Sequence, residues 1–261
     1  MQQVTELLTA NNISFEVYVE DWPQDFDEHT DIFLVGGDGT LNYFINKYPH
    51  NTRPLSIFKG GSGNDFCWKL YGNLSVKEYF ERIMYCQPRK VDAGICNGNY
   101  FANGVGIGFD GAIVKGMKQR RLFSAGHVAY YIAVIRSLLF YLEKRMEIFL
   151  AGHVIEGRFF MISIANGERY GGGFIVAPGA EINDGKLDVV TIERIDPIRR
   201  MIHLPKLSSG THMLLPVVKK YQCGEVEVRS EKLLTAHFDG ELLESRKIMV
   251  RILPGHLWIR Y

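Results

Sequence analysis

The segment Gly36-Gly37-Asp38-Gly39-Thr40 restricts most strongly what this chain can fold into. It follows the apolar run IFLV, which predicts a strand, and precedes LNYFINKY, whose apolar spacing predicts a helix. Glycines at such a junction let the backbone approach a ligand closely, and the helix N-terminus offers unpaired N–H groups to a phosphate. Because the segment contains neither GK[ST] nor GxGxxG, it predicts a phosphate-binding loop of another class. A plain glycine-rich turn is the alternative.

The surrounding pattern predicts a small parallel α/β domain over residues 1–88. Helix-like VTELLTANN is followed by strand-like ISFEVYV and DIFLVGG, helix-like LNYFINKY, strand-like PLSIFKG and helix-like SVKEYFERIMYC. Ser75 and Glu78 fit a capping box at the start of the last helix.

Residues 89–261 predict a larger, mostly β domain that resembles a sandwich with inserted helices. Asn97-Gly98 is a hairpin signal, and EIFLAGHVIEGRFFMISIAN predicts a second hairpin. One long helix is expected from about Ser124 to Arg145, and a short one near Asp196 to Lys206. We expect the functional site between the two domains.

A second glycine loop, Gly60 to Phe66, also follows an apolar strand. Ser62 can donate a hydrogen bond to a phosphate, and Asn64 and Asp65 suit a helix N-cap. An ordinary loop with a helix cap explains this segment equally well.

Two further segments carry carboxylates in turns. Asp184-Gly185-Lys186 is first of all a hairpin turn, but its carboxylate and carbonyls, with Glu181 nearby, could hold a hard cation such as magnesium. Asp239-Gly240-Glu241 is also most simply a turn. Its carboxylates become candidate general bases if the chain folds back beside the first glycine loop.

Composition excludes several classes of protein. With 261 residues, 46% hydrophobic and 23% charged, the chain is expected to be globular rather than disordered or membrane-spanning. The formal charge of +1 gives no general attraction to nucleic acid. The four cysteines form no CxxC pair, which argues against a zinc site or a disulfide framework. No signal peptide is apparent at the N-terminus, so a cytoplasmic location is expected.

Five motifs occur together in one order, and they cover the chain from about Asp31 to Pro254. They are GGDGT at Gly36, GSGNDF at Gly61, VDAG at Val91, GGGFIVAPGAEINDGKLDVV at Gly171 and HFDGE at His237. In this combination the chain resembles the diacylglycerol kinase catalytic domain family of lipid kinases, which includes bacterial soluble lipid kinases and sphingosine kinases.

The resemblance implies a two-domain α/β plus β-sandwich kinase. Such an enzyme transfers the γ-phosphate of ATP to a hydroxyl of diacylglycerol or a related lipid alcohol, with magnesium, in phospholipid biosynthesis. The implied nucleotide-binding residues are Gly36, Gly37, Asp38, Gly39, Thr40, Gly61, Ser62, Asn64 and Asp65. The implied magnesium residues are Asp184, with the backbone at Glu181 and Lys186, and Asp38 and Asp92 through its water network. Asp239 with Glu241 would activate the lipid hydroxyl.

Two departures from the family pattern affect nucleotide binding. Family members begin with a strand and an Asn-Pro-x-Ser-Gly-like phosphate loop, whereas this sequence opens on the following helix. Only WPQDFDEHT stands where the family has a full helix before DIFLVGG, and Pro23 interrupts it. Either the chain is a truncated version of a longer protein, or it is a trimmed member that binds ATP less completely.

Three functions therefore remain in competition. GGDG also occurs in NAD kinases and phosphofructokinases, so NAD or another small molecule is an alternative acceptor. GSGNDF and the late DGE are lipid-kinase features and favour a lipid. A catalytically impaired, lipid-binding homologue is the third reading, motivated by the absent first loop.

A lipid substrate raises the question of membrane contact. A basic group that could hold an anionic bilayer precedes the apolar helix: Lys115, Lys118, Arg120 and Arg121. In the alternative this is a solvated turn, and the helix packs its apolar face on the β domain through Tyr130, Val134, Leu138 and Tyr141. A transient contact would place the protein peripherally at the inner membrane face. A homodimer is neither predicted nor excluded.

Overall fold

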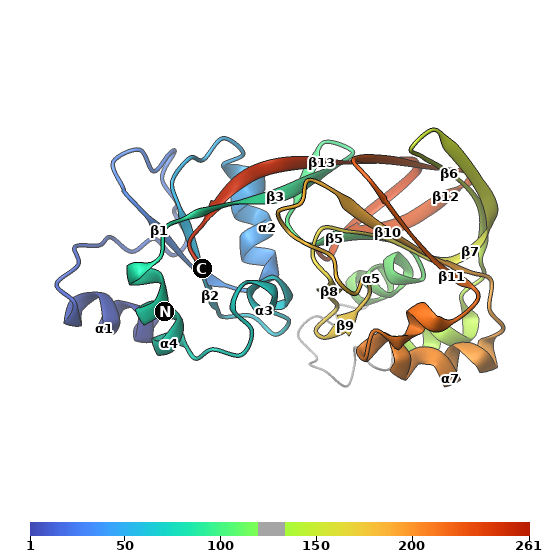
Figure 1. Cartoon of the computed structure of the whole chain (residues 1–261), viewed down its shortest axis with the longest axis horizontal. Coiled ribbons are helices and arrows are strands. Elements are labelled where there is room, and N and C mark those ends of the chain that lie inside the picture. Colours follow the sequence, from blue (N-terminus) through green and yellow to red (C-terminus); the bar gives the residue numbers. More distant parts are fainter. Residues whose placement is uncertain (120–133) are drawn as a thin grey trace.

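One twisted sheet runs through the computed structural model, which describes residues 1–119 and 134–261 (Figure 1). β1 (Ile32–Gly36) pairs in parallel with β2 (Leu55–Lys59). β2 meets the end of β13 (Glu241–Ile259), which runs antiparallel to β12 (Glu225–Phe238) and β3 (Arg89–Cys96). The 19-residue β13 therefore connects the two halves of the molecule.

Four helices surround the parallel pair: α1 (Gln2–Ala10), α2 (Asp38–Lys47), α3 (Asp65–Tyr71) and α4 (Val76–Tyr85). The predicted capping box of α4 is confirmed, because Ser75 accepts from the Glu78 N–H and the Glu78 carboxylate accepts from the Ser75 N–H. The strand expected in ISFEVYV is wrong. Residues 13–19 form no strand, and Phe15, Val17 and Val19 are exposed, so the alternating pattern buries no apolar face.

The second half is built mainly of antiparallel strands. These are β4 (Asn99–Phe101), β5 (Gly104–Gly108), β6 (Lys144–Leu150), β7 (His153–Ala165), β8 (Arg169–Tyr170), β9 (Phe174–Ile175), β10 (Leu187–Glu193) and β11 (Val218–Cys223). Both predicted hairpins are confirmed: β3 pairs with β4, and β6 with β7. Asn97 and Gly98 both have positive φ angles, as the tight turn between β3 and β4 requires.

Short helices cover one face of these strands: α5 (Phe109–Gln119), a helix over residues 134–140, α7 (Pro197–Ser208) and the 3₁₀ turn η2 (Thr211–Leu214). The helix predicted to reach Arg145 ends earlier, because KRMEIFL alternates buried and exposed side chains and pairs with β7 as β6. Its predicted start, with Tyr130, lies outside the described residues. Val134 and Leu138 are buried, as expected for packing on the β domain. In the part of the chain described, no helix combines the length and apolarity needed to cross a bilayer.

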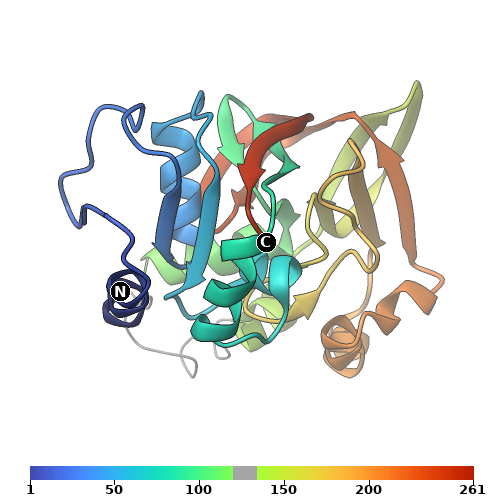
Figure 2. The same cartoon turned by 60° about the vertical axis from the view of Figure 1, so that its left-hand side comes forward.

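The end of the chain returns to the first half, and Figure 2 shows β13, in red, ending beside the teal helix α4. Leu257 and Ile259 are buried in the same core as Val91 and the side chains of α2 and α4. The Arg260 guanidinium pairs with Asp31 at 2.7 Å. A boundary at residue 88 stays a prediction, since the core of the first half draws on residues from both sides of it.

Candidate active site

The two glycine loops lie side by side because each leaves the end of a neighbouring parallel strand. The Gly60 N–H donates to the Gly36 carbonyl at 2.9 Å. A Cβ on Gly37 would lie 2.8 Å from the Gly61 Cα, and one on Gly61 would lie 2.6 Å from the Gly37 Cα. These glycines are therefore required by the contact between the loops themselves. Gly39 differs, because a Cβ there would meet nothing within 4 Å.

Asp38 caps the helix that follows the other loop. Its carboxylate accepts from the N–H groups of Asp65 and Phe66, both at 3.1 Å, so the N-terminus of α3 already holds an anion. Asn64 has a left-handed φ of 52° and folds back on its own loop, accepting from the Gly61 N–H at 2.9 Å. By contrast, no side chain in the described residues caps α2. An incoming phosphate would find its free N–H groups at α2.

The two hydroxyl residues of the loops differ in exposure. Ser62 is exposed at the tip of the second loop. Thr40 is half-buried, and its side chain fills the space where a Cβ on Gly36 would lie. Ser62 is therefore the more accessible hydroxyl for a ligand.

Asp65 joins the first half to the glycine run of the second. Its buried carboxylate accepts from Arg169 Nε and from the Gly172 N–H, both at 2.7 Å. The Arg169 guanidinium also stacks 4.5 Å from the centre of the Trp68 ring. Burial raises the pKa of Asp65, and the charge of Asp38 raises it further, while the Gly172 and Arg169 hydrogen bonds oppose the shift. The Asp65 carboxylate thus holds the two segments together through one ion pair and one backbone hydrogen bond.

Asp239 occupies a pocket of backbone N–H groups. Its carboxylate accepts from Ala102 at 2.7 Å and from Asn103 and Gly104 at 3.0 Å. Asn42, on α2, lies 3.4 Å away, so the chain does fold back and bring the DGE turn beside the first glycine loop. Burial raises the pKa of Asp239 to about 6, against the lowering effect of the N–H donors, and the charge of Asp38 adds to the rise.

Glu241 has a different environment from Asp239. It is exposed and pairs with Lys118 at 2.7 Å. Lys115 pairs with Glu244 at 2.7 Å, so both described cations of the predicted basic cluster are matched by carboxylates. Arg120 and Arg121 of that cluster, and Ser124, lie outside the described residues.

The expected metal residues are divided between a buried and an exposed group. Asp92 is buried, and its carboxylate accepts from the N–H groups of Gly185 and Gly255, both at 2.7 Å. Asp184 is exposed and accepts from the Lys186 N–H at 3.0 Å.

One oxygen of the exposed Glu181 carboxylate lies 3.5 Å from Lys69 Nζ. Among the described residues no group of three or more acidic, histidine or cysteine side chains is placed to hold a metal ion. One exposed carboxylate with turn carbonyls is nevertheless a donor set that suits a magnesium ion keeping several waters.

Comparison with known proteins decides the family. The model of the diacylglycerol kinase catalytic domain matches residues 1–96, and that of the YegS C-terminal NAD kinase beta sandwich-like domain matches residues 103–260. The chain belongs to the family of the YegS C-terminal NAD kinase beta sandwich-like domain, preceded by a segment that matches the diacylglycerol kinase catalytic domain. The resemblance seen in the sequence is therefore confirmed, and the two-domain kinase fold with a mostly sheet second domain comes with it.

Individual relatives agree with this membership. A protein of Chromohalobacter salexigens named a probable lipid kinase YegS-like is 28% identical over 87% of this chain and 74% of its own length. The crystal structure of a diacylglycerol kinase from Bacillus anthracis superposes with a TM-score of 0.68 at 23% identity, covering 89% of this chain and 76% of that one. The structure of an NAD kinase from Archaeoglobus fulgidus in complex with ATP superposes with a TM-score of 0.59 at 13% identity. The match covers 100% of this chain and 88% of that one. These two structures support the fold.

The structure also contains a buried polar cluster beside Asp239 that the sequence did not predict. The Tyr170 hydroxyl donates to Asp110, and the rings of Tyr170 and His237 meet edge to face, with centroids 5.2 Å apart. His237 Nδ1 accepts from the Gly240 N–H at 3.3 Å. Burial raises the pKa of Asp110 to about 6 and lowers that of His237 to about 4, so His237 is neutral at pH 7. The only signal was the position of His237 two residues before Asp239.

Proposed function

We propose that this chain transfers the γ-phosphate of ATP to a hydroxyl of diacylglycerol or a related lipid alcohol, with magnesium. One observation carries the proposal: Asp239, a carboxylate with a pKa of about 6, lies beside α2, whose N-terminus carries no side-chain cap among the described residues. Phosphoryl transfer requires a place for the phosphates and a group that accepts the proton of the attacking hydroxyl. Membership of the family and the names of the relatives support a kinase that acts on lipids.

The nucleotide is assigned to the two loops. Its phosphates would lie against residues 36–40 and the N–H groups at the start of α2, and Ser62 would donate to them. Asn64 and Asp65 would act by holding the second loop in shape, since their side chains bind Gly61, Arg169 and Gly172.

Magnesium is assigned to the turn at residues 181–186. Asp184 and the backbone of Glu181 and Lys186 would hold it, and its charge would offset the negative charge of the phosphates. Asp38 and Asp92 would accept hydrogen bonds from its waters. Each is fixed by two backbone N–H groups, so neither has to be reoriented to do so.

The proton of the lipid hydroxyl is assigned to Asp239. At neutral pH a carboxylate with a pKa of about 6 is ionised, and it is a stronger base than an ordinary carboxylate. Glu241 stands two residues further along but is exposed and paired with Lys118, so we assign it a supporting role in this turn. Transfer of labelled phosphate from ATP to diacylglycerol in mixed micelles tests the whole assignment.

Activity is expected to depend on pH in the direction set by this base. Asp239 must be deprotonated to act, so kcat/KM should rise with pH through about 6 and level off above it. A profile between pH 5 and 8, measured with a short-chain diacylglycerol that needs no bilayer, checks this. Activity that stays level from pH 7 down to pH 5 would show that Asp239 does not supply the base.

Two glycine variants separate ligand contact from loop packing. Gly39→Ala should leave the fold intact, because its Cβ faces open space and alanine favours a helix, but it should weaken ATP binding about tenfold or more if phosphates lie against it. Gly61→Ala should weaken ATP binding and also destabilise the protein, since its Cβ overlaps the Gly37 backbone. Calorimetric titration with ATP and thermal unfolding give both readings. If Gly39→Ala binds ATP with the wild-type affinity, the ATP phosphates do not lie against this loop.

A further inference from the structure

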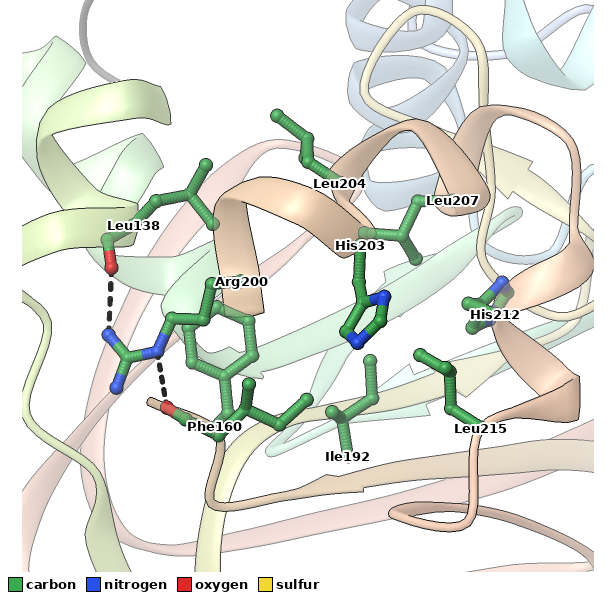
Figure 3. A pocket seen from close by; sticks show the side chains of 10 residues that line it. Leu138, Phe160, Ile192, Arg200, His203, Leu204, Leu207, His212 and Leu215 are labelled. Atoms are coloured by element: carbon green, nitrogen blue, oxygen red, sulfur yellow. Dashed lines mark hydrogen bonds between the residues drawn. The ribbon is translucent and has the colours of Figure 1, made fainter. Parts of the chain in front are cut away.

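Two helices of the second half carry apolar side chains on their exposed side as well as on their buried side. On α7, Arg200 is buried and Leu204 and Leu207 are partly buried, and they line a cavity of about 30 Å³ against the sheet together with Leu138 and Phe160 (Figure 3). The opposite side of α7 carries Ile198, 73% exposed, and Ile202, 63% exposed. The i and i+4 spacing of these isoleucines makes a second apolar stripe.

The helix over residues 134–140 repeats this arrangement. Val134 and Leu138 are buried, whereas Ile135 and Leu139, again four residues apart, are each 43% exposed. Arg200 fixes the two helices together, because its guanidinium donates to the carbonyls of Leu138 at 2.8 Å and Tyr141 at 2.9 Å. The stripes therefore belong to one layer, seen with α7 at the lower right of Figure 1. We define the outer helical face as Ile135, Leu139, Phe140, Leu142, Ile198, Met201, Ile202 and Leu214.

Basic side chains outnumber acidic ones around this face. Residues 134–142 and 194–215 contain a single acid, Asp196, which is exposed and pairs with Arg199. Two acids border these ranges: Glu143 is buried in an ion pair with Arg200, and Glu193 pairs with Lys219. Besides Arg199, two basic side chains of these residues are exposed: Arg136 and Arg194. An apolar face flanked by cations is the pattern that binds an anionic bilayer, through apolar insertion and attraction to acidic headgroups.

The inner side of this helical layer packs into a core that reaches the candidate site. Val134, Leu138 and Tyr170 belong to one buried cluster, and Tyr170 contacts Asp110 and His237 beside the DGE turn. A layer that rests on a bilayer would thus place its inner side toward the site at which we assign the lipid hydroxyl.

We propose that the outer helical face docks on an anionic membrane surface. This inference rests on the proposed function for its purpose, since a diacylglycerol substrate lies in a bilayer. It replaces the basic cluster expected from the sequence, whose described members, Lys115 and Lys118, are paired with Glu244 and Glu241.

Sedimentation with vesicles of phosphatidylcholine and phosphatidylglycerol tests the proposal. Ile198→Ser/Ile202→Ser should bind these vesicles at least about tenfold more weakly than the wild type, with an unchanged melting temperature, because both side chains are exposed. Val17→Ser/Val19→Ser, which removes similarly exposed apolar side chains from the first half, should bind as the wild type does. Arg136→Glu/Arg194→Glu should lose binding only where phosphatidylglycerol is present.

Kinase assays separate this proposal from the proposed function. The isoleucine variant should lose activity on diacylglycerol in vesicles and keep wild-type turnover on a soluble short-chain diacylglycerol. If neither the wild type nor any variant phosphorylates either lipid, the proposed function is wrong. The vesicle-binding measurements still test whether the outer helical face docks on a membrane. Wild-type vesicle binding by the isoleucine variant would overturn the proposal. The proposal would also be overturned if the wild type were a dimer and the isoleucine variant a monomer that still binds vesicles. The outer helical face would then bind a second copy of the chain.

Discussion

Replacement of Asp239 by asparagine is expected to lower kcat for phosphoryl transfer by about 10²- to 10⁴-fold, the usual contribution of a general base. The carboxylate lies next to α2 and its pKa of about 6 suits proton transfer near neutral pH. Asparagine is the informative replacement, because it tolerates the left-handed φ of 45° and its carbonyl can still accept from the Ala102 or Gly104 N–H. Turnover with ATP and diacylglycerol, with circular dichroism as a check on folding, measures the effect.

Glu241→Gln is the matched control for this variant. Glu241 lies in the same turn but is exposed and paired with Lys118, so its loss should change kcat less than about tenfold. A large loss of kcat in Glu241→Gln together with normal turnover in Asp239→Asn would identify Glu241 as the base and refute our assignment.

Asp92→Ala is expected to reduce the free energy of unfolding by about 3–5 kcal/mol, because it leaves two backbone N–H groups without their charged acceptor. Those groups belong to Gly185 and Gly255, so one buried side chain secures two separate turns. Urea unfolding of the wild type and the variant measures the difference.

Asp184→Ala supplies the comparison from the same turn. Its exposed carboxylate accepts only a local hydrogen bond from Lys186, so the variant should lose no more than about 1 kcal/mol. We expect it instead to raise the magnesium concentration needed for activity. Equal stability of the Asp92 and Asp184 variants would contradict the structural role of Asp92.

The sequence predicted those parts of the fold that near neighbours determine. The capping box at Ser75 and the turn at Asn97-Gly98 depend on residues within a few positions, and both are present. The strand in ISFEVYV was wrong because alternation cannot show whether a partner strand exists. The return of Leu257 and Ile259 to the first core was equally invisible, since it depends on the path of β13.

The sequence indicated which segments form the candidate site, but not which side chains contact each other there. Motifs separated by about two hundred positions do meet, as Asn42 and Asp239 show. The partners of individual side chains were not predictable, because a carboxylate that caps another helix, as Asp38 does, has the same local sequence as one that binds a ligand. The cluster of Asp110 with Tyr170 was not predicted either, because the local sequence of each residue does not show that the two side chains meet.

Transfer of labelled phosphate from ATP to a panel of acceptors, with magnesium and in mixed micelles, tests the central claim most directly. The panel contains diacylglycerol, a sphingoid base, a ceramide, NAD and a sugar, and Asp239→Asn is assayed alongside the wild type. We predict a labelled product with one of the lipid alcohols that is lost in the variant. Label only on NAD or the sugar, or no transfer to any lipid by folded protein, would contradict the assignment as a lipid kinase.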